Sequence, residues 1–427
     1  MKKGLITAVI GVYILGLCTV FAWAALPENV EDALPPDARD LLEQLDDDTA
    51  DSGTLSAGAA KLWNKAWTLL TAEVRSSVRV MVVLLGAILA AQWFSSTADG
   101  FLEACGNAVV WPMLVCGVAL ALLAWALAAL APRKGLWEVC REMRGFAVFP
   151  ALGALLFTLL AATALRDGLN VLNLFLLSET PRWFLVLLLL PLLVCMAALG
   201  IASVSRALKL LAPVLGALYL IVLVLSVWNQ ADVYNFFPLL GKGVPALART
   251  AVSGLSAAAW LPMLWIDRPR LARAAAVGGK GGLLGCALCV TGYVFYALLF
   301  PNGAAQGADF PLHRLSASGG FSSAFQRTHS LFIFVWMPVQ MTAVGAGLCY
   351  AVRSLRAVIP ARNPRALVPI PLLAALALSF PDIDHSPPAL LYLLQTNVQA
   401  LLALPLLIPL LAGRLREKRQ ERRARHA

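Results

Sequence analysis

Residues 229–270 read NQADVYNFFPLLGKGVPALARTAVSGLSAAAWLPMLWIDRPR, and this stretch decides how the rest of the chain is interpreted. It is long enough to cross a bilayer once, because a spanning helix needs about 20 residues. Small residues nevertheless occupy its middle at Ser253, Gly254 and Ser256, and Pro262 follows. An unpaired backbone group in hydrocarbon is costly, so a poor helix at that depth must be shielded by protein or line a cavity.

Two interpretations of this stretch stay open from its pattern alone. Interrupted spans are the best sequence indication of a transporter-type binding site. A Ser- and Gly-rich segment is equally typical of a helix that packs tightly against its neighbours.

The composition places the whole chain in a membrane. Of its 427 residues, 60% are hydrophobic and 14% are charged, and the mean hydropathy is +0.76. A soluble domain carries about 25% charged residues. The sequence therefore predicts an all-α polytopic membrane protein.

Metal, disulfide and enzyme chemistry find little support in the residue pattern. The eight cysteines lie mostly in apolar stretches, where cysteine behaves as a small hydrophobe. Cys286 and Cys289 form a lone CxxC pair, and a zinc site needs more ligands than two. The four histidines are scattered, and neither a nucleophile–base pair nor a phosphate-binding loop is present. We expect no metal, no cofactor and no enzyme activity.

The N-terminal part reads as an export signal followed by an acidic segment. Residues 1–25 combine Lys2 and Lys3, an apolar core and an A-x-A pattern, which predicts a signal peptide or an uncleaved anchor. Residues 26–52 carry ten acidic residues and one Arg. Residues 58–77 show apolar residues at helical spacing and predict an amphipathic helix on a membrane surface. Residues 26–77 are thus one acidic and amphipathic unit.

Ten apolar spans follow this unit. They cover residues 78–95, 108–131, 146–165, 183–204, 207–228, 244–266, 281–300, 331–351, 366–380 and 390–412. The transmembrane bundle is therefore expected over residues 78–412.

Basic residues set the expected orientation of these spans. The connections from residue 132 onward alternate between rich and poor in Lys and Arg, which predicts a cytoplasmic C-terminus. An exported segment at 26–77 followed by two spans would place Arg133 and Lys134 outside, against that rule. Either the first span is re-entrant, or the acidic segment is not exported, or this basic loop is an exception.

Two further segments carry expectations of their own. The Gly- and Ser-rich loop at 301–330 is either a binding lid or a flexible linker. Residues 413–427 form a basic cytoplasmic tail that we expect to be attracted to anionic lipid of the bilayer rather than to nucleic acid.

Four passages between Pro132 and Pro381 stand out, in chain order PRKGLWEVCREMRG, LRDGLNVLNLFLLSETPRWFLVLLLL, VYNFFPLLGKG and FPLHRLSASGGFSSAFQRTHSLFIFVW. Together they resemble the spore germination receptor B-subunit family (GerAB-like), which belongs to the amino-acid/polyamine/organocation transporter superfamily. The resemblance implies a transporter-like 5+5 inverted-repeat bundle, with a transporter-like core from about residue 132.

The resemblance also implies a ligand site. In that superfamily, spans one and six are broken near the bilayer midplane, and their exposed amide groups receive a substrate carboxylate. Carried onto this sequence, the site would comprise Gly86 in span one and Ser253, Gly254 and Ser256 in span six. Trp260 would close over an apolar side chain, or it would pack at the interface or against lipid.

The N-terminal part includes LPENVEDALPPDARDLLEQLDDD and the Trp-containing amphipathic helix, followed by the first two spans. With these features the first 125 residues or so resemble a different protein, stage III sporulation protein AE. The chain is therefore expected to be a fusion or hybrid of two sporulation membrane proteins.

Two functions from different classes follow from these resemblances. The first is a membrane subunit of a spore nutrient-germinant receptor, which binds a small germinant such as an amino acid between spans one and six and signals by changing conformation. The second is a structural component of a stage III sporulation channel complex between mother cell and forespore. Either would act in a membrane of an endospore-forming bacterium, with other germination-receptor or sporulation-complex membrane subunits as partners.

Overall fold

The computed structural model describes residues 78–96, 101–132, 134–143, 146–175, 177–227, 231–267, 274–302, 310–318, 328–359, 364–380 and 394–426. Within these ranges every regular element is a helix, so the predicted all-α class is confirmed. The predicted signal peptide, acidic segment and amphipathic helix at residues 1–77 lie outside the described residues, as does most of the loop at 301–330.

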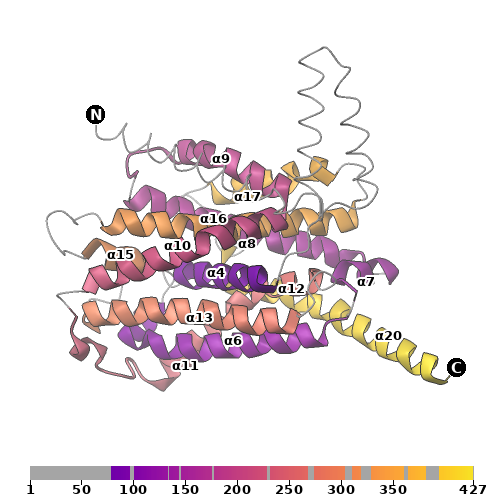
Figure 1. Ribbon diagram of the computed structural model, residues 1–427, viewed down its shortest axis with the longest axis horizontal. Helices are drawn as coiled ribbons and strands as arrows, with labels where there is room; N and C mark the ends of the chain where they lie inside the picture. The colour runs from indigo at the N-terminus through magenta and orange to yellow at the C-terminus, as the bar shows by residue number, and fades with distance from the viewer. Residues whose placement is uncertain are drawn as a thin grey trace, which may run out of the picture.

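Long helices lying side by side form the body of the protein (Figure 1). They are α4 (Val78–Ser96), α6 (Val110–Leu130), α8 (Val148–Phe175), α9 (Arg182–Leu199), α10 (Ile201–Val227), α13 (Ala274–Leu299), α16 (Thr328–Val358) and α20 (Leu407–His426).

Shorter elements connect and flank these helices. The short α-helices are α5 (Phe101–Cys105), α7 (Leu136–Glu142), α11 (Val244–Gly254), α12 (Pro262–Ile266), α15 (Pro311–Ser318), α17 (Pro369–Ser379) and α19 (Thr396–Ala403). The 3₁₀ helices are η2 (Gly106–Val109), η3 (Val233–Phe236), η4 (Leu255–Trp260), η7 (Pro364–Leu367) and η9 (Leu404–Leu406).

Seven helical segments in the described part of the chain are long and apolar enough to cross a membrane. They are Phe101–Leu130, Val148–Phe175, Arg182–Leu199, Ile201–Val227, Ala274–Leu299, Leu331–Val358 and Asn397–Arg423. The segments Val80–Phe94 and Arg365–Ser379 are apolar but shorter. The sixth predicted span, 244–266, is divided among α11, η4 and α12. The count of ten spans and the inverted repeat therefore stay predictions.

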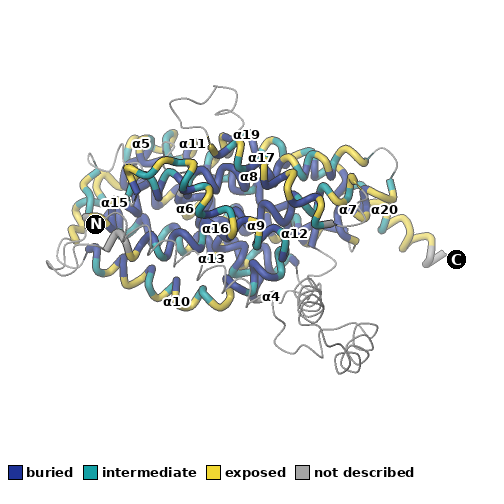
Figure 2. Tube along the Cα trace, turned by 90° about the horizontal axis from the view of Figure 1, so that it is seen from above, coloured by how far each residue is buried: buried dark blue, intermediate teal, exposed yellow. Residues whose placement is uncertain are grey.

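Burial follows the pattern expected of a bundle immersed in lipid. Figure 2 shows buried residues along the interior and exposed residues on the outside, for example along α10. The outward faces carry large apolar side chains, among them Leu122 at 62% and Trp125 at 55% exposure. A water-soluble protein rarely exposes so much contiguous apolar surface, whereas lipid tails accept it.

Glycines allow α13 to approach two neighbours closely. A Cβ placed on Gly282 would lie 2.7 Å from Ala121 Cα of α6, and one on Gly278 would lie 2.8 Å from the Ala124 carbonyl oxygen. On the adjacent face, a Cβ on Gly281 would lie 2.8 Å from the Leu85 side chain of α4. Membrane helices associate through such small residues because lipid provides no hydrophobic force between them.

The two ends of the bundle differ in charge, and the basic end is the one that carries α7, α12 and the projecting part of α20 (Figure 1). At this end Arg416 of α20 pairs with Glu142 of α7 at 3.3 Å, and Lys134 pairs with the same carboxylate. The opposite end carries α5 and α15 (Figure 2), and η3 lies there beside the end of α13.

Residue 78 enters the bundle at the basic end. Leu85 of α4 lies beside Gly281 of α13, and Leu89 lies beside Gly285. Residue numbers therefore increase in the same direction along both helices, which are parallel. Because α13 begins at the basic end, α4 begins there as well (Figure 1). Residue 78 and Lys134 thus lie at the same end of the bundle.

Candidate functional site

The predicted span at residues 244–266 is a broken helix. Its α-helical hydrogen bonding stops after Gly254, and residues Leu255–Trp260 form a 3₁₀ helix before α12 begins at Pro262. Pro262 has no amide hydrogen and cannot donate to the Ala258 carbonyl as an α-helix requires. The Leu261 amide donates to that carbonyl instead, at 2.9 Å, which is the shorter-range pairing of a 3₁₀ helix.

The end of α4 meets this break with two polar side chains. The indole Nε1 of Trp93 donates to the Gly254 carbonyl oxygen at 2.9 Å. The indole Nε1 of Trp260 donates to Gln92 Oε1 at 3.3 Å. Gln92, Trp93 and Trp260 are all buried. The first and sixth predicted spans therefore meet at the break, where Gln92 and Trp93 of α4 contact the predicted residues Trp260 and Gly254.

The sixth-span residues of the predicted site lie at or beside the break. Gly254 is the last residue of α11, and a Cβ there would lie 2.9 Å from Cys116 Sγ of α6. The missing side chain therefore allows α11 to pack closely against α6. Ser253 is half-buried and Ser256 is buried within η4. Gly254 therefore packs tightly on α6 through its Cα, while its carbonyl oxygen accepts a hydrogen bond from α4. The binding-site interpretation of the stretch stays a prediction.

Trp260 and its neighbour Trp265 are inside the bundle. Their exposures are 0% and 3%, so the alternative in which Trp260 packs against lipid is wrong. The Trp260 ring lies 6.4 Å from the ring of Phe157 in α8. Trp260 therefore packs in the interior of the bundle, directly at the break.

Gly86 does not mark a break in the first span. The helix α4 is continuous from Val78 to Ser96, and a Cβ on Gly86 would meet the Leu284 side chain of α13 at 2.7 Å. Gly86 serves the packing of α4 on α13, and the contacts of α4 with the break come from Gln92 and Trp93. A polar Gln inside an apolar span was the available signal, because intramembrane polar residues are costly and mark functional sites.

The outer half of the broken segment, α11, is fixed at the opposite end of the bundle. Thr250 Oγ1 lies 3.0 Å from Cys105 Sγ of α5. Just before α11, Lys242 Nζ donates to the Glu103 carbonyl oxygen at 2.6 Å. Side-chain contacts therefore tie the outer half to α5.

Buried polar groups gather at the break, namely two indole N–H groups, the Gln92 amide, the Ser256 hydroxyl and the backbone of η4. Both indole N–H groups donate within the protein, to Gly254 and to Gln92. Among the described residues no group of three His, Cys, Asp or Glu side chains is arranged to hold a metal ion. Such a set can orient a small polar molecule through hydrogen bonds and cover its apolar part with aromatic rings.

A comparison with protein families gives the relationship of the chain. The sequence profile described as spore germination protein, the spore permease family, matches residues 108–386. No curated protein matches the chain. The matched region begins at the end of η2 and includes the broken segment, all of α13 and all of α16. Because the match covers more than half of the chain, this integral membrane protein belongs to the spore germination protein family.

Proposed function

We propose that the protein is the membrane subunit of a spore nutrient-germinant receptor, which binds a small germinant at the junction of α4 with the break at Leu255–Trp260. The observation that supports it most is the interruption of the α-helical ladder at Gly254, with α4 side chains directed onto it. Membership of the spore germination family supplies the biological setting.

The proposed ligand is an amino acid. Its carboxylate would accept hydrogen bonds from the Ser256 hydroxyl and from backbone amides of η4, and its side chain would lie against Trp260. Gln92 is a further partner for its ammonium group. Within the site proposed from the sequence, Ser253, Gly254, Ser256 and Trp260 are kept, and Gln92 and Trp93 replace Gly86 as the contribution of the first span.

The orientation proposed here places the basic end in the cytoplasm. Lys134, Arg141, Arg356 and Arg416 all belong to that end, and basic residues accumulate on the cytoplasmic side of membrane proteins. The germinant would then reach the break from the side of α5 and α15, the opposite end.

Thermal unfolding of the purified protein in detergent tests the binding. Each common L-amino acid is added in turn, and a ligand at a hundredfold excess over its Kd stabilises the folded state by about 2.7 kcal/mol. At least one amino acid is expected to raise Tm. The variant Ser256→Ala should reduce that rise, whereas Gly216→Ala should leave it unchanged, since a Cβ on Gly216 meets nothing within 4 Å. No shift with any amino acid would overturn the proposed ligand class.

Spore physiology separates this function from the structural alternative. In the native strain, Gly254→Leu should abolish nutrient-triggered germination while spores form normally, and Gly216→Leu serves as the matched control. Trp260→Phe provides a milder variant should Gly254→Leu fail to fold. Normal germination together with arrested forespore development would instead favour a role in the sporulation channel complex.

A further inference from the structure

The inner half of the broken segment is the short helix α12, and α-helical backbone hydrogen bonds do not connect it to α11. The helix α12 spans only Pro262–Ile266 and is separated from α11 by the 3₁₀ turn. A continuous helix would transmit the anchoring of α11 on α5 to this half, but the break interrupts that ladder. The position of α12 must therefore be fixed by side chains.

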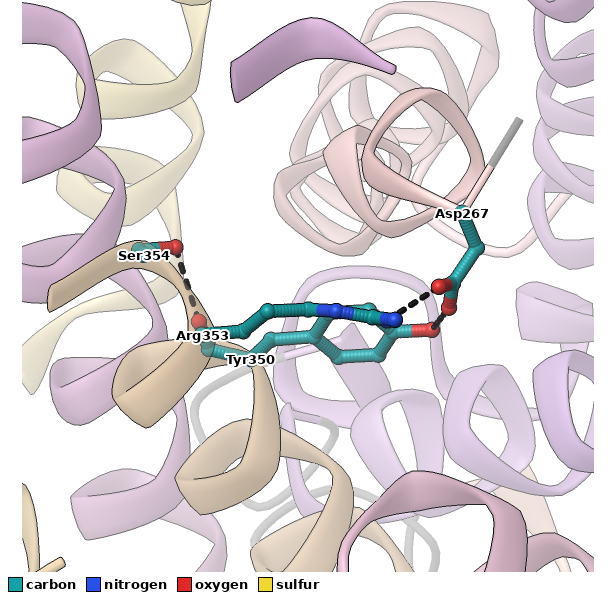
Figure 3. A network of polar contacts seen from close by, with 4 residues as sticks. All are labelled: Asp267, Tyr350, Arg353 and Ser354. Atoms are coloured by element: carbon teal, nitrogen blue, oxygen red, sulfur yellow. Dashed lines mark hydrogen bonds and ion pairs between the residues drawn. The ribbon is translucent and has the colours of Figure 1, made fainter. Parts of the chain in front are cut away.

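Asp267, the residue that follows α12, provides such an anchor (Figure 3). Tyr350 Oη donates to Asp267 Oδ2, and Arg353 Nη1 pairs with Asp267 Oδ1. Both partners belong to α16, which thus holds the inner half at the basic end. The Asp267 side chain is 3% exposed, while that of Arg353 is 23% exposed and reaches toward the surface.

The rings of Phe157 and Tyr350 support both ends of the inner half. The Tyr350 ring lies 5.2 Å from the Phe157 ring, and Phe157 lies 6.4 Å from Trp260. Trp260 precedes α12 and Asp267 follows it, so both boundaries of this half rest on the Phe157–Tyr350 pair. Ser354 Oγ donates to the Tyr350 carbonyl at 2.7 Å, within the same turn of α16.

A buried ion pair is stable when it is closed or when it is fully open, and intermediate separations are unfavourable. Removing one partner from such a pair leaves an uncompensated buried charge and is strongly unfavourable. When the pair opens as a whole, however, both charged groups regain water at the basic end. The contact therefore favours two discrete positions over a continuous range.

We propose that Asp267, Tyr350 and Arg353 form a latch that holds α12 closed against α16, and that the inner half swings about η4 when the latch opens. The outer half stays in place during this movement, because Thr250 and Lys242 tie it to α5. The proposal rests on these contacts and does not require that any germinant binds at the break.

Thiol labelling of a cysteine at the end of α12 measures the opening. Ile266 is 7% exposed, so in the variant Ile266→Cys a soluble maleimide reacts only when the inner half moves. The labelled peptide is quantified by mass spectrometry in detergent-solubilised full-length protein, which distinguishes the introduced thiol from the native cysteines. Adding Asp267→Asn should raise the labelling rate about tenfold or more, because Arg353 loses its counter-charge.

Two further variants keep the test decisive. Tyr350→Phe removes one hydroxyl and should raise labelling by a smaller factor, about threefold, corresponding to one hydrogen bond. Exchanging the charges in Asp267→Arg with Arg353→Asp should return the rate toward that of Ile266→Cys alone. Glu142→Gln is the matched control, because it breaks an exposed ion pair at the same end without touching α12 or α16.

The outcomes that overturn the latch are equally definite. Labelling at the parental rate in both Asp267→Asn and Tyr350→Phe would show that the pair does not hold the inner half. An equal rise in Glu142→Gln would show a general loosening of the basic end. If Asp267→Asn does not fold, Tyr350→Phe and the exchanged pair decide the question by the same rates.

Discussion

The indole nitrogen of Trp93 donates a hydrogen bond to the carbonyl oxygen of Gly254 at 2.9 Å, across 161 residues of sequence. This bond joins the first span to the point at which the α-helical ladder of the sixth stops. It satisfies a backbone oxygen at a depth where no lipid group can do so. The break is therefore tolerated because α4 supplies a donor.

Replacing Trp93 by Phe should destabilise the protein modestly. The variant loses the donor to the Gly254 oxygen, worth about 1 kcal/mol, and the smaller ring leaves a cavity at this buried position, so the total loss should exceed about 1 kcal/mol. The free energy of unfolding in a denaturing detergent titration measures it. Trp125→Phe is the control, since Trp125 is 55% exposed on the lipid-facing surface. Equal losses in the two variants would contradict the assigned role of the bond.

Two glycines three residues apart on α13 should respond to alanine with opposite signs. A Cβ on Gly282 would lie 2.7 Å from Ala121 Cα, a backbone atom that cannot move aside alone, so Gly282→Ala should cost about 1–3 kcal/mol. A Cβ on Gly279 meets Trp125 Cβ at 3.5 Å, an ordinary contact, so Gly279→Ala should gain up to about 1 kcal/mol of helix propensity. Denaturing titrations of both variants provide the measurement, and the same sign for both would refute the close approach of α13 to α6.

The contact between α7 and α20 should depend on pH. The hydrogen bond from Lys134 lowers the pKa of Glu142, and the charges of Lys134 and Arg416 act in the same direction. A lowered carboxyl pKa contributes stability above the pKa of the unfolded chain, and that stability is lost as pH falls through the folded pKa. The contact should therefore persist at pH 5 and be lost only below the ordinary glutamate pKa of about 4.3.

A fluorophore on the tail reports this contact. Gln420 is exposed on α20, so a dye attached to Gln420→Cys should show anisotropy that stays high to pH 5 and falls under stronger acid. Glu142→Gln should show the low value already at neutral pH. Anisotropy that is unaffected by this variant would mean that α20 is held by other contacts.

Cys140 of α7 should resist alkylation under ordinary conditions. Burial raises the pKa of its thiol to about 12, and the thiolate is the reactive form. Because the raised pKa keeps the thiol protonated as pH rises, iodoacetamide should leave Cys140 unmodified at pH 8 in the folded protein. The same protein unfolded in detergent should be modified rapidly, and peptide mass spectrometry distinguishes the two states. Rapid modification of folded protein would show that α7 leaves the bundle.

Local features of the fold were accessible from the sequence because they depend on neighbouring residues. The run from Ser253 to Pro262 combines small residues with a missing amide hydrogen, and the break falls there. The basic residues around Lys134 and in the tail indicated that both lie at one end, and Glu142 and Arg416 meet there. The family resemblance over residues 132–381 agrees with the profile match over 108–386.

The sequence alone thus predicted a helical membrane protein, a poor helix around Ser253–Ser256 and the family to which the chain belongs. That this poor helix is broken, and not only tightly packed, was decided by the structure. Only the tertiary structure decided that Gln92 and Trp93, and not Gly86, reach the break, and that Asp267 is bound by Tyr350 and Arg353. The physical reason is that periodicity and missing donors act over a few residues along one helix. Which face of α4 or α16 meets the sixth span depends on how the helices rotate and shift against one another, and close approaches such as that of Gly281 to Leu85 fix this only in the folded bundle.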